Sequence, residues 1–275
     1  MRRFIKLQVF VLMFVSTMSS AVETRFMQGL GDTHYQQMDS RIIERRYHIY
    51  IMLPNGYEQS PDEDYPTIYV LDGGALFPLL SAYYRYLNLG EEIPDAIIVG
   101  ISYGSDNFEN GNYRSTDYTA KSADRDYWGG AGRFQLFLSD ELFPMIERTY
   151  RSRADQRVIF GQSIGGQFVL YTALTKPNLF WGHIASNPAL HRNLPFFLRK
   201  HGPTATRGEQ SKLFVGSGSL DDPRFREPAL RWIEYWSNND DNPWKLRTMN
   251  LDGHTHMSAP PASFRQGMSW LFSKD

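Results

Sequence analysis

The amino-acid sequence predicts an α/β fold, with a mostly parallel, doubly wound sheet and helices on both of its faces. Short apolar runs alternate with helical stretches along the chain, which is the pattern of strand–helix–strand units. One run leads directly into a serine that lies between glycines at the start of a helix. A last strand, a loop with two histidines and an amphipathic helix close the chain.

The first predicted element, residues 40–53, alternates polar and apolar positions and indicates an antiparallel edge. Helices are expected at residues 132–149 and 166–175, and a closing helix at 264–272 has its apolar residues on one face. No repeat or linker interrupts the pattern, so we expect a single α/β domain over residues 22–275. Strands are expected at the apolar runs 49–53, 67–71, 96–101, 158–160, 183–185, 213–215 and 246–251.

The first 21 residues have the three parts of a secretory signal peptide. A basic start contains Arg2, Arg3 and Lys6, and an apolar core over residues 9–15 is too short to remain as a membrane anchor. Small residues precede a cleavage site after Ala21. We therefore expect a periplasmic or secreted bacterial protein with no membrane span after signal cleavage.

Charge and cysteine content exclude several classes of protein. The chain has 29 Lys and Arg against 30 Asp and Glu, so its formal net charge is −1, and loss of the three cations of the signal peptide makes it −4. Such a chain lacks the basic surface that nucleic-acid binding requires. Because the sequence has no cysteine, disulfides, thiolate catalysis and a lipid-anchored N-terminal cysteine are excluded.

The segment Gly161-Gln162-Ser163-Ile164-Gly165 has the form of a nucleophile elbow. An apolar run precedes it and a helical stretch follows it, so a sharp turn would hold the Ser163 hydroxyl above the sheet. The Ile164 N–H, at the start of the helix, would face the negative charge of a tetrahedral intermediate. A second donor is expected after an earlier strand, where Asp72-Gly73-Gly74 offers the Gly74 N–H.

A base and an acid should follow the serine along the chain. His254 and His256 both lie in the loop after the last predicted strand, and either could reach the strand ends. The acid should follow the strand before it, where Asp221 and Asp222 occur. We prefer Asp221 because Asp222 precedes a proline and suits the role of a helix cap.

The segment 103–132 is too long for a plain connection and is rich in aromatic and basic residues. Loops at the carboxyl ends of parallel strands line the pocket in this architecture. We therefore expect Arg114, Tyr127 and Trp128 to contact the substrate, although the two aromatic side chains could equally pack the loop onto the body of the protein.

These features together resemble the putative-esterase family of α/β hydrolases, which contains esterase D-type hydrolases, siderophore esterases and mycolyl transferases. The resemblance implies an α/β-hydrolase fold, a serine esterase without a metal or cofactor, and a small-molecule ester as its partner, of a siderophore-like or aryl type. It also selects His256 over His254, because His256 stands in register with Ser258, Pro260 and the helix that follows. The matching segments are residues 53–57, 69–74, 114–119, 141–144, 161–165, 186–190, 255–260 and 267–272.

Two other functions use the same residues or the same scaffold. An acyltransferase would resolve the acyl-enzyme with an alcohol in place of water. A non-catalytic binding module could keep the fold and lose the chemistry, but the complete set of Ser163, His256 and Asp221 argues against it.

Overall fold

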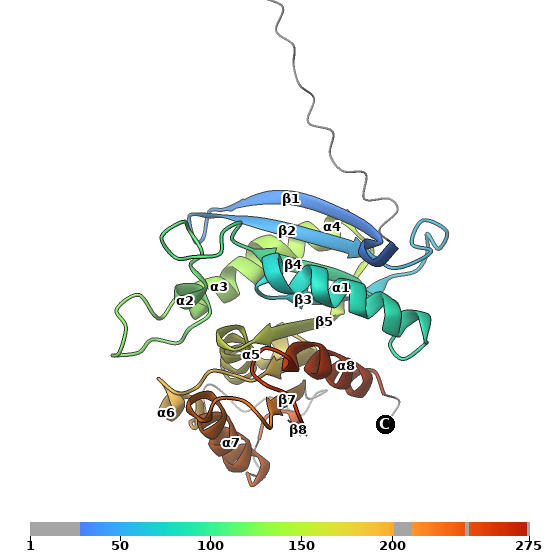
Figure 1. Cartoon of the computed structure of the whole chain (residues 1–275). Helices are drawn as coiled ribbons and strands as arrows, with labels where there is room; N and C mark the ends of the chain where they lie inside the picture. The colour runs from blue at the N-terminus through green and yellow to red at the C-terminus, as the bar shows by residue number, and fades with distance from the viewer. Residues whose placement is uncertain (1–27, 201–210, 240–241, 274–275) are drawn as a thin grey trace, which may run out of the picture.

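The structure is a computed structural model and describes residues 28–200, 211–239 and 242–273. Its eight-stranded sheet has the strand order β1-β2-β4-β3-β5-β6-β7-β8 (Figure 1). The pairs β1–β2 and β2–β4 are antiparallel and the other neighbours are parallel, so the mostly parallel sheet and its antiparallel edge are confirmed. The strands are β1 (Asp32–Ser40), β2 (Arg45–Leu53), β3 (Tyr65–Val70), β4 (Ile97–Ser102), β5 (Ser152–Gln162), β6 (Gly182–Ser186), β7 (Lys212–Gly218) and β8 (Lys245–Leu251).

Helices cover both faces of the sheet, as in an α/β-hydrolase fold. The aromatic and aliphatic side chains of α1 and α8 pack on one face, with Phe77 and Phe264 among them. Those of α3, α5 and α7 pack on the other, with Phe134, Phe168 and Trp232 among them. The helices are α1 (Gly73–Leu89), α2 (Arg114–Asp117), α3 (Ala131–Phe137), α4 (Phe143–Thr149), α5 (Ile164–Thr175), α6 (Leu194–Phe197), α7 (Pro223–Ser237) and α8 (Ala259–Leu271).

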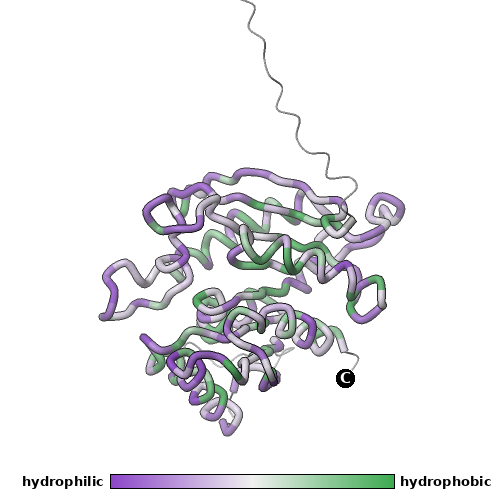
Figure 2. Tube along the Cα trace, viewed as in Figure 1, coloured by the Kyte–Doolittle hydropathy of each residue, from purple (hydrophilic) through white to green (hydrophobic). Residues whose placement is uncertain are grey.

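The antiparallel edge differs from the prediction in its extent. The predicted edge began at Ser40, which is instead the last residue of β1, and the chain turns before β2 begins at Arg45. Most of β1 is exposed. Its residues are mainly hydrophilic, as the colour of the outer strand shows in Figure 2. Strands are predicted from the alternation of apolar and polar residues, and an exposed strand has few apolar residues. The sequence therefore offers little indication of β1.

The predicted helix 132–149 is helical but not uniform. A π-helical turn at Leu138–Leu142 separates α3 from α4. The predicted signal peptide, residues 1–21, lies outside the described residues. In the part of the chain that the structure describes, no helix combines the length and the hydrophobicity needed to cross a membrane.

Candidate active site

The turn between β5 and α5 holds Ser163 in a backbone conformation that few residues adopt, with φ 59° and ψ −116°. Glycines flank the turn because the backbone comes close to itself there. A Cβ on Gly161 would lie 2.3 Å from the carbonyl oxygen of Gly165. The Ser163 N–H donates to the Ser186 carbonyl at 3.0 Å, and the Ala189 N–H donates to the Ser163 carbonyl at 3.0 Å. These contacts fix the strained turn that the sequence predicts at this position.

Asp221 and His256 meet after β7 and β8. The His256 Nδ1 lies 2.9 Å from Asp221 Oδ2 and 3.1 Å from Oδ1. The Asp221 carboxylate is 1% exposed and the imidazole is 19% exposed. A carboxylate that accepts from Nδ1–H leaves Nε2 as the nitrogen that can take a proton.

The two neighbouring candidates have other partners. Asp222 accepts a hydrogen bond from the Arg224 N–H at 2.8 Å and caps α7. The His254 Nδ1 lies 3.0 Å from the Ser258 carbonyl. The structure therefore pairs Asp221 with His256, and it places Asp222 and His254 in local turns.

The loop that carries His256 also contacts the strand that carries the serine. The Gln162 side-chain amide donates to the His256 carbonyl at 2.7 Å, and Gln162 directly precedes Ser163. Ser163, Asp221 and His256 follow the carboxyl ends of the parallel strands β5, β7 and β8, so all three lie at the same end of the sheet.

A phenylalanine stacks on the imidazole of His256. The Phe225 ring in α7 lies 4.7 Å from the His256 ring, centroid to centroid, with 30° between the planes. The Arg224 guanidinium lies over the Phe225 ring at 4.4 Å. Phe225 lies in the first turn of α7, two residues after Pro223, and the residues around it form no motif, so it could not be predicted from the sequence.

The two predicted oxyanion donors lie at the starts of two helices that follow neighbouring strands. Ile164 is the first residue of α5 and Gly74 is the second residue of α1. N–H groups in the first turn of a helix have no acceptor within the helix, and they carry the positive end of its dipole. A Cβ on Gly165 would lie 3.2 Å from Asp72 Oδ2, so the start of α1 lies against the elbow.

Arg114 forms a two-point ion pair with Asp72. Its Nε and Nη2 donate to the two carboxylate oxygens at 2.6 and 2.8 Å. Burial disfavours the charged guanidinium, but the adjacent Asp72 carboxylate outweighs this and raises the pKa of Arg114 above its ordinary value. Asp72 has a φ of 54° and directly precedes α1. The ion pair with Arg114 therefore stabilises the turn that leads to Gly74.

The two aromatic residues predicted to contact substrate differ in exposure. Tyr127 is 45% exposed, and its ring lies 5.4 Å from that of Phe108, which is also exposed. Trp128 is 8% exposed. Tyr127 is therefore accessible to a ligand, whereas most of the Trp128 side chain is covered by the protein.

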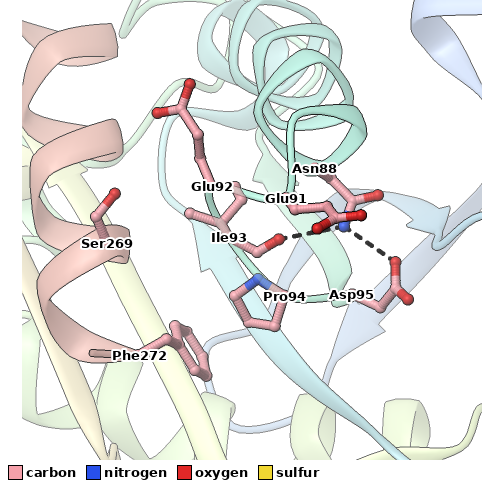
Figure 3. A pocket seen from close by; sticks show the side chains of 8 residues that line it. All are labelled: Asn88, Glu91, Glu92, Ile93, Pro94, Asp95, Ser269 and Phe272. Atoms are coloured by element: carbon pink, nitrogen blue, oxygen red, sulfur yellow. Dashed lines mark hydrogen bonds between the residues drawn. The ribbon is translucent and has the colours of Figure 1, made fainter. Parts of the chain in front are cut away.

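A separate pocket of about 440 Å³ lies beyond the C-terminal ends of α1 and α8 (Figure 3). The Asn88 side chain donates there to the Ile93 carbonyl and to Asp95, at 3.3 and 3.0 Å. The residues that line the pocket include Glu91 and Glu92 but no histidine. Because α1 runs back from the strand ends that bear the elbow, this pocket lies at the opposite end of the sheet from Ser163.

Comparisons with known proteins agree with this architecture. The family described as "Putative esterase" matches residues 40–263. The chain is 30% identical to ferri-bacillibactin esterase BesA of Bacillus subtilis, over 88% of this chain and 90% of that protein. The crystal structure of the BES protein from Bacillus cereus has a TM-score of 0.74 and 26% identity, covering 88% of this chain and 96% of that one. An IroE-like serine hydrolase from Shewanella oneidensis has a TM-score of 0.73 and 25% identity, covering 88% and 80%.

Proposed function

Because the chain belongs to the putative-esterase family, and is a carboxylic-ester hydrolase, we propose that Ser163, His256 and Asp221 form its catalytic triad. The observation that carries the proposal is the hydrogen bond of 2.9 Å between His256 Nδ1 and the buried Asp221 carboxylate, in a loop that contacts the elbow. It supports an imidazole held with its proton on Nδ1, so that Nε2 is oriented to accept a proton from the serine.

In this mechanism the Ser163 Oγ attacks the ester carbonyl while His256 Nε2 takes its proton. The tetrahedral intermediate collapses to an acyl-serine, and His256 returns the proton to the departing alkoxide. Water then attacks the acyl-serine, again giving up a proton to His256, which passes it to the serine oxygen as the carboxylic acid is released. Asp221 remains ionised and stabilises the imidazolium that forms in each step.

The oxyanion would accept hydrogen bonds from the Gly74 and Ile164 N–H groups. Both groups lie at helix starts, where the dipole favours negative charge. The ion pair between Arg114 and Asp72 supports this assignment, because it holds the turn before Gly74 in a conformation with positive φ.

The proposed substrate is a siderophore-like or aryl ester. The name of the Bacillus subtilis relative supports this class. The exposed rings of Tyr127 and Phe108 could stack on an aromatic acyl group. Arg114 would offset negative charge on the substrate only with the part of its guanidinium that faces away from Asp72.

The proposed site of action is the periplasm or the outside of a bacterial cell. The basic, apolar and small-residue parts of residues 1–21 support export and cleavage after Ala21. The mature protein would then be a single domain over residues 22–275.

The test compares kcat/KM for a cyclic catecholate triester with that for p-nitrophenyl acetate and butyrate, with Ser163→Ala as the background. A preference for the catecholate ester supports the substrate class. A preference of more than about tenfold for the short alkyl esters, or about 1.4 kcal/mol, would indicate a general carboxylesterase instead. Mass analysis with an added alcohol separates hydrolysis from acyl transfer, since only a transferase would make mainly the new ester.

A further inference from the structure

We propose that the side-chain amides of Gln162 and Asn187 are positioning groups that hold the backbone of His256 and so set the distance between base and nucleophile. The inference rests on the proposed triad. Neither side chain would touch the substrate, and both would act through His256.

Gln162 connects the loop of the base to the strand of the nucleophile by one hydrogen bond. It is buried at the end of β5 and is covalently bonded to Ser163. Its Nε2 donates to the His256 carbonyl at 2.7 Å. Any shift of the His256 backbone away from Ser163 must therefore lengthen this hydrogen bond.

Asn187 joins the loops of the acid and the base. It is 1% exposed and lies after β6 with a φ of 40°, a conformation that asparagine tolerates better than most residues. Its Oδ1 accepts from the Gly218 N–H at 2.7 Å, three residues before Asp221. Its Nδ2 faces the carbonyls of Thr255 and His256 at longer distances, 3.4 and 3.5 Å.

The acid and base loops also bond to each other. The Leu220 N–H donates to the His254 carbonyl at 2.9 Å, beside the bond between Asp221 and His256. These contacts hold the acid and the base together as one unit. The paired strands β5 to β8 place this unit at the same end of the sheet as Ser163. The amides of Gln162 and Asn187 add direct side-chain links to it, from the end of β5 and from the loop after β6.

A misplacement of about 1 Å in a reacting group can cost about 100-fold in rate. Loss of the Gln162 donor should therefore lower kcat by about 10- to 100-fold and leave KM within about twofold. A purely structural amide would instead lower stability and leave the rate of the folded enzyme unchanged.

The experiment uses Gln162→Met, which keeps the length of the side chain and removes the donor, and Asn187→Asp, which keeps the acceptor for the Gly218 N–H. Gln162→Glu has the shape of glutamine and carries the test if Gln162→Met does not fold. The matched control is Gln135→Met in α3, where a buried amide donates to Thr172 and Thr175 at 3.2 and 2.9 Å. For each variant we would measure kcat, KM, the rate of inactivation by a fluorophosphonate and the urea unfolding midpoint.

The proposal predicts that the Gln162 variants lose kcat and fluorophosphonate reactivity together, with a smaller loss in Asn187→Asp and none in Gln135→Met. Wild-type rates in both Gln162 variants, with an inactive Ser163→Ala, would overturn the positioning role and leave the triad intact. An equal loss of rate in Gln135→Met would also overturn it. An active Ser163→Ala would refute the proposed function itself.

Discussion

The carboxylate of Asp221 lies 2.9 Å from the Nδ1 of His256 and is almost fully buried. The next residue, Asp222, also donates its backbone N–H to Asp221 Oδ1 at 2.7 Å. Two donors therefore converge on one carboxylate, and they orient it toward the imidazole.

Asp221→Asn should lower kcat by about 10²- to 10⁴-fold, because an amide can hold the imidazole in the wrong tautomer. Asp222→Asn should change kcat by less than about twofold, since asparagine also caps helices well. Steady-state kinetics on p-nitrophenyl butyrate checks both variants. The reverse ranking would assign the acid to Asp222.

His256→Ala should reduce kcat nearly as much as Ser163→Ala, because nucleophile and base act as a unit. His254→Ala should cost far less, since the His254 Nδ1 faces the Ser258 carbonyl within its own turn. The same assay compares the three variants. A total loss in His254→Ala with an active His256→Ala would move the base to His254.

Tyr127→Ala and Trp128→Ala should have different effects because of their different exposure. Tyr127→Ala should raise KM for aryl esters more than for acetyl esters, with little change in stability. Trp128→Ala should lower the free energy of unfolding by about 3 to 5 kcal/mol, as for other large buried aromatic residues. Kinetics with paired esters and urea unfolding measure these effects, and an unchanged unfolding midpoint in Trp128→Ala would contradict its packing role.

Burial lowers the pKa of His183 from 6.5 to about 4. Between these values the unfolded chain binds a proton that the native protein does not, so the free energy of unfolding should fall as pH falls from 6.5 to 4. The loss in the free energy of unfolding should reach about 3 kcal/mol near the pKa of the folded protein. It should disappear above the pKa of the unfolded chain. His183→Leu should remove this part of the pH dependence in urea unfolding, and parallel curves for variant and wild type would contradict the assignment.

The parts of the fold that depend on local pattern could be predicted from the sequence. The apolar run before Ser163 and the glycines around it specify a strand, a sharp turn and a helix, and the structure has all three. The exposed strand β1 lacks an apolar face, so its extent could not be predicted. The stacking of Phe225 on His256 and the ion pair between Arg114 and Asp72 join residues far apart in the sequence, and only the folded chain brings them together.

The most direct test of the central claim is the mass of the protein and of its peptides after reaction with a fluorophosphonate. The account predicts one adduct per chain, on the peptide that contains Ser163, with loss of ester hydrolysis in proportion to labelling. Ser163→Ala should remain unlabelled and inactive. Ester hydrolysis that persists in a fully labelled protein, or in Ser163→Ala, would contradict the account.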